Sequence, residues 1–383
     1  MRENSFFLWQ YTSIMGTIER SDYPFSSREG RRKIEKQEDW KKLLKADPTD
    51  WLLEEDNPAV RYLALRDIVE AGEKEVQTAR RKAHREGPIA TILDNMNPEG
   101  WWVHPGAVYN PKCTGTSWSI LALAQMGGSV EEDKRVAAAC SYLLDNALAK
   151  GGQFSSNGDA SKTFNCFQGN MLTSLMDLGC RDERIDNAFE WTARTVTGKD
   201  LPSEVTREGL DQVSDSSGKL YRFIHITGPL FSCRRLKHCA WAGAKIMLSF
   251  SRIPEEKRSP LVQRAIQTGV DYFFASDPAT ANFPGETAPR PDRRWWKFHF
   301  PVTGMDLLQV AEALTGLGYG ADPRLANTLN LIRSKQDENG RWLREKNYGY
   351  WHKWWVDYGP YNKPNKWVTL RAMRVLKQAG DKP

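Results

Sequence analysis

Six long apolar segments recur along the chain from about residue 38 onward. They are rich in Ala, Leu and Met, they are apolar on nearly all sides, and most of them end in Gly, a common residue just after a helix. Such segments are typical of helices that are buried on most faces. They cover residues 57–72, 113–127, 166–179, 233–250, 302–318 and 366–380.

Amphipathic segments with helical spacing alternate with the apolar ones. They cover residues 38–45, 87–96, 132–148, 184–196, 259–275 and 323–336. Because strand patterns are almost absent, the alternation predicts an all-α fold, an (α/α)6 toroid of six helical hairpins with an inner and an outer ring. An open solenoid of helix pairs is the alternative. Insertions at 198–228, 277–298 and 343–362 favour the closed ring, with elaborated loops at one mouth.

Composition adds limits on domains and partners. Residues 1–36 are polar and mixed, so we expect a partly disordered N-terminal arm before a single toroid domain at 37–383. The net charge of +6 is mild and the basic residues are scattered, so no nucleic-acid partner is expected. No apolar run approaches the roughly 18 residues of a membrane span. We expect a cytoplasmic protein; contact with a membrane surface and the oligomeric state stay open.

The stretch "SKQDENGRW" at residues 334–342 closes one amphipathic helix. It places Gln336 four residues before Gly340 and six before Trp342. A glutamine here can satisfy free backbone groups at a helix end, the glycine permits a tight turn, and the Trp packs between hairpins. The motif therefore predicts a structural connection. Weaker copies are "LDNMNPEGWW" at 93–102 and "LAKGGQF" at 148–154.

This motif resembles the QW repeat of squalene-hopene cyclases and related triterpene cyclases. The resemblance extends over most of residues 40–380 and points to the toroid superfamily of terpenoid cyclases and protein prenyltransferases. It implies an isoprenoid or another apolar substrate in the central cavity. The chain departs from the family because it lacks the acidic strings Asp-x-Asp-Asp and Asp-Asp-x-x-Asp. Its length fits the single barrel of a prenyltransferase subunit better than a two-barrel cyclase.

Three cysteines occupy the same place in three successive apolar helices. Cys113, Cys166 and Cys233 each lie at a helix start, so their thiols would converge at one mouth of a toroid. Protein prenyltransferases place zinc ligands around similar positions. One hypothesis is a soft metal ion, zinc first, bound by these thiolates. The alternative is that they are buried core residues. The fourth ligand would come from His225, His238, His299, a water or a substrate thiolate.

Other polar residues occur near the same helix starts. Asp306 lies inside an apolar pattern, where a carboxylate with a raised pKa could act as general acid or base. The alternative is a buried ion pair with Arg61, Arg371 or Lys366. His238 and His299 are candidates for proton transfer or metal ligation, and the alternative for each histidine, which we favour, is a structural role.

Aromatic residues, including many of the 15 Trp, are concentrated in loops that precede apolar helices. These loops predict the wall of a largely apolar pocket, suited to a hydrocarbon or carbocation and also to stacking against a sugar. Packing between hairpins is the alternative role. The candidate substrate-binding residues are Trp101, Trp102, Tyr109, Trp295, Trp296, Trp351, Trp354 and Trp355.

Three functions fit these observations. The first is an enzyme of the cyclase or prenyltransferase kind, a lyase, isomerase or transferase acting on an apolar substrate with the help of a thiolate-bound metal. The second is a carbohydrate-active (α/α)6 enzyme, which needs two carboxylates beside the cavity, with Asp306, Asp357 and Glu286 as candidates. The third is a non-catalytic toroid that binds a lipid or a partner.

Overall fold

The computed structural model describes residues 40–197, 239–284, 291–346 and 353–380. All of them belong to one compact unit, Trp40–Pro383. The predicted N-terminal arm at 1–36 and the insertion at 198–228 lie outside the described residues. Within the described part of the chain, no helix is both long and apolar enough to cross a bilayer.

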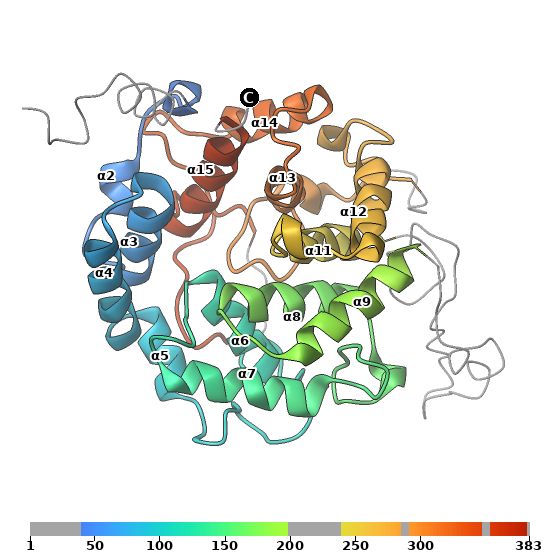
Figure 1. The fold of residues 1–383 in the computed structure, drawn as a ribbon. Coiled ribbons are helices and arrows are strands. Elements are labelled where there is room, and N and C mark those ends of the chain that lie inside the picture. The colour runs from blue at the N-terminus through green and yellow to red at the C-terminus, as the bar shows by residue number, and fades with distance from the viewer. Residues whose placement is uncertain (1–39, 198–238, 285–290, 347–352, 381–383) are drawn as a thin grey trace, which may run out of the picture. The chain divides into compact units, whose positions relative to one another are not determined.

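The predicted inner helices form a closed ring (Figure 1). Neighbours in chain order pack against each other from α6 through α8, α11 and α13 to α15, and α15 packs against α3. The end of α6 lies so close to α3 that a Cβ added at Gly127 would be 2.7 Å from the side chain of Leu63. The (α/α)6 toroid is therefore confirmed. The inner helices are α3 (Pro58–Ala64, extended by the π-helical turn η2, Leu65–Val69), α6 (Thr116–Gln125), α8 (Asn165–Asp177), α11 (Ala240–Phe250), α13 (Leu307–Gly316) and α15 (Lys366–Gly380).

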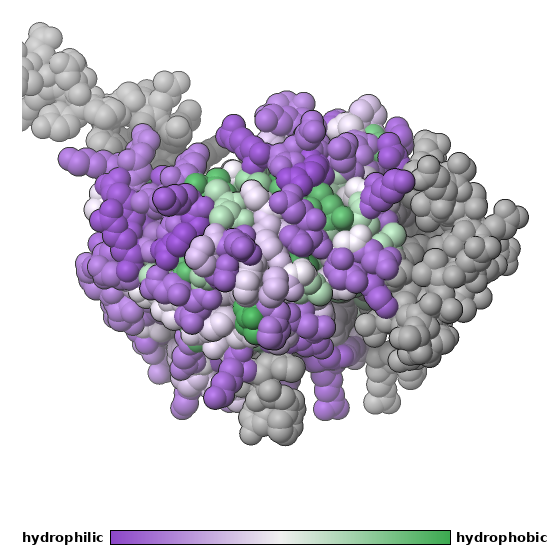
Figure 2. All heavy atoms as spheres, turned by 90° about the horizontal axis from the view of Figure 1, so that it is seen from below, coloured by the Kyte–Doolittle hydropathy of each residue, from purple (hydrophilic) through white to green (hydrophobic). Residues whose placement is uncertain are grey.

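The outer helices bury one face and leave the other in water. They are α4 (Glu73–Arg85) with α5 (Pro88–Asp94), α7 (Lys134–Ala147), α9 (Glu183–Thr197), α12 (Pro260–Phe273) and α14 (Ala326–Ser334). Short elements connect the hairpins: η1 (Trp40–Leu43), α2 (Thr49–Leu52), η3 (Ala160–Lys162), η5 (Glu255–Lys257), η6 (Pro278–Thr280), η7 (Arg293–Trp296) and η8 (Pro323–Leu325). The face seen in Figure 2 is largely hydrophilic, with small hydrophobic patches between hydrophilic residues.

The prediction that inner and outer helices alternate strictly was wrong at the start of the ring. The expected outer helix at 38–45 is, within the described residues, a single 3-10 turn, Trp40–Leu43. The helix α4 was not expected, because its sequence "EKEVQTARRKAHR" offers few apolar positions to a periodicity argument. Between them, α4 and α5 cover the outside of the first hairpin.

The predicted structural role of Gln336 is confirmed. Its side-chain oxygen accepts the backbone N–H of Lys45 at 2.6 Å, and its amide donates to the carbonyls of Ala46 at 3.0 Å and Gly340 at 2.9 Å. These bonds join the end of α14 to a segment about 290 residues earlier in the chain. Gln336 therefore links the last hairpin to the first and closes the ring.

Two tryptophans of the repeat make the same pair of hydrogen bonds. Each donates its indole N–H to the carbonyl ten residues earlier in the preceding outer helix, at 2.7 Å from Trp342 and 2.8 Å from Trp102. Each also donates its backbone N–H to a threonine hydroxyl on the next inner helix, Thr369 at 2.9 Å or Thr116 at 3.2 Å. The weaker motif at 93–102 is therefore a true structural copy of the one at 334–342.

Candidate functional site: a charged central cavity

A cavity of about 760 Å³ lies inside the inner ring, and all six inner helices contribute to its wall. The contributing residues come mainly from the middle and last turns of those helices, as shown by Asp67 in η2, Asp177 at the end of α8 and Lys377 in α15. The cavity therefore lies towards the end of the ring where the inner helices finish. The mouth predicted from the sequence was at the other end, where they begin.

Ten charged side chains line this cavity in the described part of the chain. Its apolar members are mostly aliphatic, and Phe300 is the one aromatic ring among the described lining residues. The wall therefore differs from the apolar, aromatic pocket that the sequence predicted. The cationic lining residues are Arg66, Lys245, Arg252, Arg371, Arg374 and Lys377, and the carboxylates are Asp67, Glu70, Asp177 and Glu312.

Exposure of the lining side chains defines a floor and a rim. Lys245 is 2% exposed and Gln309 is 3% exposed, so both belong to the floor. The side chains of Arg66 and Glu70 are 45% and 46% exposed, so they form the rim through which the cavity meets water.

The rim is held by ion pairs between helix ends. Asp67 contacts Arg66 at 2.6 Å and also pairs with Arg374 of α15, while Lys377 contacts Glu70 at 2.5 Å. Burial opposes ionisation of Asp67, but the two guanidinium groups outweigh it and keep its pKa below the ordinary value. Arg66 and Asp67 both belong to the π-helical turn η2. Such turns are frequent at functional sites.

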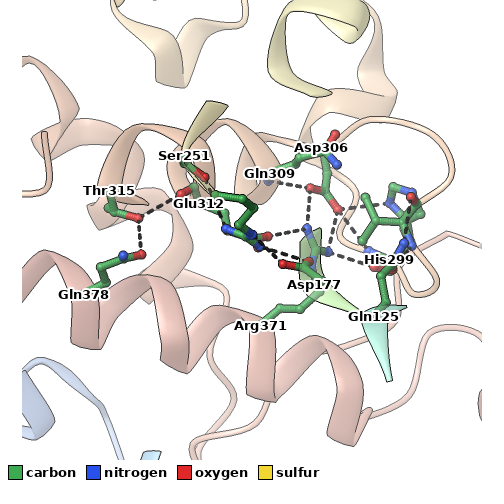
Figure 3. A network of polar contacts seen from close by, with 12 residues as sticks. Gln125, Asp177, Ser251, His299, Asp306, Gln309, Glu312, Thr315, Arg371 and Gln378 are labelled. Carbon is green, nitrogen blue, oxygen red and sulfur yellow. Dashed lines mark hydrogen bonds and ion pairs between the residues drawn. The ribbon is translucent and has the colours of Figure 1, made fainter. Parts of the chain in front are cut away.

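Arg252 connects two carboxylates of the wall, those of Asp177 and Glu312, which are labelled in Figure 3. Its guanidinium lies 2.7 Å from Asp177 at the end of α8 and 3.0 Å from Glu312 of α13. The three charges therefore meet from three neighbouring inner helices. The guanidinium of Arg252 therefore holds both carboxylates in fixed positions.

Asp306 does not line the cavity but holds residues that do (Figure 3). Its carboxylate accepts the backbone N–H of Gln309 at 2.8 Å and so caps the N-terminus of α13. It also accepts two hydrogen bonds from Arg371, at 3.1 and 3.2 Å, and lies 3.0 Å from Nδ1 of His299. Arg371 lines the cavity, whereas neither Asp306 nor His299 does. Asp306 is therefore a positioning residue for Arg371.

The structure brings Asp306 and His299 together and confirms the ion pair with Arg371, one of the alternatives for Asp306. Burial opposes ionisation of Asp306, but Arg371 and His299 keep its pKa below the ordinary value. This direction is opposite to the raised pKa expected of a general acid. Burial lowers the pKa of His299, although Asp306 opposes that change. The third catalytic candidate, His238, lies outside the described residues.

The cysteines are only partly described. Cys113 is fully buried in a turn just before α6, and Cys166 lies half-buried in the first turn of α8. Burial raises the pKa of Cys113 to about 12, which keeps this thiol protonated, against the expected thiolate. Cys233 lies outside the described residues. Within the described ranges, no group of three or more His, Cys, Asp or Glu side chains is arranged to hold a metal ion.

Three of the predicted aromatic residues meet at the end of the ring where the inner helices begin. The ring of Trp118, in the first turns of α6, lies 5.3 Å from Tyr109 and 6.2 Å from Trp354. Trp355 donates its indole N–H to the hydroxyl of Ser119 at 2.9 Å. None of the predicted aromatic residues that the structure describes lines the cavity. Tyr109, Trp354 and Trp355 gather at the opposite end of the inner ring.

The other predicted aromatic residues lie apart from that cluster. Trp102 is buried in its repeat position, and Trp101 donates to the carboxylate of Glu99 at 3.0 Å. Trp295 is fully buried, and Trp296 donates to a backbone carbonyl, that of Ala279, at 3.0 Å. Trp351 lies outside the described residues.

The charged wall was missed at the sequence level. The signal was present, because the apolar helices carry charges in their later turns, as in "ALRDIV", "LMDLG", "GAKIM", "VAEAL" and "LRAMRVLK". Charges at corresponding turns of adjacent helices in a ring face the same lumen. The cysteines and aromatic loops, by contrast, are found at the first turns, away from this cavity.

Comparison with known proteins identifies no family. No family model matches the chain, and no curated protein matches it. Among solved structures, the type II terpene cyclase MstE from Scytonema is 14% identical over 76% of this chain and 95% of its own, with a TM-score of 0.29. A possible member of the GH105 family from Klebsiella pneumoniae subsp. pneumoniae is 12% identical over 98% of both chains, with a TM-score of 0.42. Similarities this low identify neither a reaction nor a substrate.

Proposed function

We propose that the protein is an enzyme acting on a hydroxyl-rich, carbohydrate-type substrate held in the central cavity. The observation that carries this proposal is the set of paired arginines and carboxylates in the cavity wall, which come from five of the six inner helices and their ends. Ion pairs held in place by several helices present fixed hydrogen-bond donors and acceptors. Such an arrangement suits a ligand with many hydroxyl groups.

The same wall makes an isoprenoid a poor occupant. A hydrocarbon chain would displace water from charged groups such as Arg252 and Arg371 without replacing their hydrogen bonds, which is costly. Aromatic rings that could stabilise a carbocation are gathered at the other end of the ring, around Trp118. These observations favour the carbohydrate hypothesis over the isoprenoid hypothesis.

Asp177 and Glu312 are the carboxylates that we assign to the substrate. They reach Arg252 from α8 and from α13, so they flank one stretch of the wall. In the ionised form they would accept hydrogen bonds from hydroxyls, and either could take a proton from an attacking water. Zinc at the three cysteines stays a prediction and supplies no step in this proposal.

A substrate panel on the full chain tests the proposal. Neutral oligosaccharides, acidic oligosaccharides and the uncharged prenyl alcohol farnesol would each be added, with the melting temperature and products by mass spectrometry as readouts. We expect at least one saccharide to raise the melting temperature and to be converted, because a ligand that binds only the folded state stabilises it. Stabilisation by farnesol and by no saccharide would contradict the proposal. Saccharide binding without conversion would indicate that the protein is a saccharide-binding toroid and not an enzyme.

A further inference from the structure

Lys245 is a buried cation on the cavity floor. It lies in the middle of α11 and is 2% exposed. Its ammonium group donates to the side-chain oxygen of Asn170 on α8 at 3.0 Å, and this partner is a neutral amide. An ammonium group carries three donors. Among the described residues, the Asn170 bond accounts for one of them.

Lys245 differs in this respect from the other cations of the wall. Arg252 and Arg371 each contact Glu312, and the remaining three also have carboxylate partners. The described wall holds six cations and four carboxylates, and Asp306 behind Arg371 makes a fifth carboxylate. One positive charge is therefore left over among these residues, and it belongs to the side chain without a carboxylate contact, Lys245.

Two polar atoms of uncharged side chains in the same wall also lack a partner among the described residues. They are the hydroxyl of Thr173, one turn after Asn170 on α8, and the side-chain oxygen of Gln309 on α13. Buried polar groups are nearly always hydrogen-bonded, so unsatisfied ones beside a buried cation indicate a ligand site. The two groups come from the helices on either side of α11, which carries Lys245.

We propose that Lys245, together with Asn170, Thr173 and Gln309, forms a subsite that binds the carboxylate of an acidic sugar. This inference rests on the proposed function and names the substrate class within it. A carboxylate carries one negative charge, which matches the single uncompensated cation. A phosphate carries nearly two, and no further uncommitted cation is found in the described wall. The neutral amide and hydroxyl groups would complete the hydrogen bonds of the carboxylate oxygens.

The proposal makes binding dependent on the charge of Lys245. Burial lowers the pKa of Lys245 to about 8, and the charges that bear on it are Cys166, Asp306, Lys346 and Arg371. A bound carboxylate favours the ammonium form. Affinity for an acidic sugar should therefore be highest below pH 8 and fall by up to about tenfold per pH unit above it, while a neutral sugar shows no such fall.

Calorimetric titration of the full chain with glucuronate and glucose tests the subsite, because the two sugars differ only by the carboxylate. We expect the wild type to prefer glucuronate, and Lys245→Met to weaken glucuronate binding by about 10- to 100-fold with little effect on glucose. Lys74→Met, at an exposed position of α4, is the matched control and should change neither affinity.

The outcomes separate this inference from the proposed function. Equal binding of both sugars by the wild type, or unchanged glucuronate affinity in Lys245→Met, overturns the subsite and leaves the proposed function standing. Binding of neither sugar counts against both. Displacement of glucuronate by a lower concentration of inorganic phosphate would overturn the assignment to a carboxylate.

A second measurement covers the case in which Lys245→Met does not fold. Reductive methylation of the wild-type chain, followed by mass spectrometry, reports the accessibility of each lysine. Glucuronate should protect Lys245 and glucose should not. Equal methylation of Lys245 with and without glucuronate would overturn the inference.

Discussion

Asp306 shows how a single buried residue organises the cavity floor. Its carboxylate caps α13, holds the guanidinium of Arg371 and contacts His299, all without reaching the cavity itself. The sequence correctly singled out Asp306 and named Arg371 as one ion-pair partner. It could not give the direction of the shift in the pKa of Asp306, because that direction depends on whether burial or the neighbouring charges dominate.

Replacing Asp306 by Asn should destabilise the fold. Arg371 would be left buried without its main counter-charge, which costs about 3–5 kcal/mol. Urea unfolding at pH 7 measures the loss, and Asp271→Asn, at an exposed position of α12, is the control with little expected effect.

The pH dependence of that stability is a separate test. Because the pKa of Asp306 is lower in the folded state than its ordinary value of 3.8, its contribution is complete well above pH 3.8 and is lost as the pH falls below it. The wild type should therefore lose more unfolding free energy than Asp306→Asn between pH 6 and pH 3. Parallel pH profiles for the two proteins would contradict this account of Asp306.

Glu312 is the residue whose change should affect turnover most selectively. Glu312→Gln keeps a hydrogen-bond acceptor for Arg252 but removes the negative charge, so the converted saccharide should turn over about 100-fold more slowly or worse. Initial rates with that saccharide measure the effect. Glu131→Gln, with a side chain 72% exposed, should leave the rate unchanged. Equal rates for the two variants would remove Glu312 from the mechanism.

At the scale of helices, the ring depends on a few close contacts. Gln336 joins the last hairpin to the first, and Trp102 and Trp342 each connect one outer helix to the next inner helix. The close approach of α8 and α11 at Gly169 sets the spacing of the wall that carries Lys245. The sequence identified the first of these contacts by motif, but nothing in its pattern marked Gly169.

Gly169→Ala should force α8 and α11 apart. A Cβ at this position would lie 2.4 Å from the backbone carbonyl carbon of Lys245, and backbone cannot move as freely as a side-chain end. We expect a loss of about 1–3 kcal/mol or more in the free energy of unfolding, measured with denaturant. Gly72→Ala is the matched control, because no atom lies within 4 Å of its added Cβ. A similar small effect from both changes would contradict the close contact.

Gln336→Ala should loosen the closure of the ring. It leaves the N–H of Lys45 and the carbonyl of Ala46 without their partner, at a cost of about 1–3 kcal/mol. Hydrogen exchange at the Lys45 amide should become faster, while Gln77→Ala, whose amide bonds Glu73 within α4, should leave it unchanged. Unchanged exchange at Lys45 in Gln336→Ala would show that other contacts close the ring.

For the whole molecule, the sequence predicted the toroid but not the charged cavity inside it. The ring was predictable because apolar and amphipathic helices alternate, although α4 has too few apolar positions to be recognised. The cavity was not, because the conspicuous residues of the sequence, such as Cys113 and Trp102, precede an inner helix and are buried away from the cavity. Which end of a ring holds the cavity depends on side-chain packing around the axis, and helical periodicity does not report it.

The central claim is that substrate binds among the charged later turns of the inner helices and not at the aromatic end. Hydrogen–deuterium exchange of the full chain with and without saturating glucuronate tests it most directly. We predict that glucuronate slows exchange in peptides covering residues 63–70, 170–177 and 371–378, whose side chains line the cavity. Protection confined to residues 109–118 and 353–358, at the aromatic end, would contradict the account.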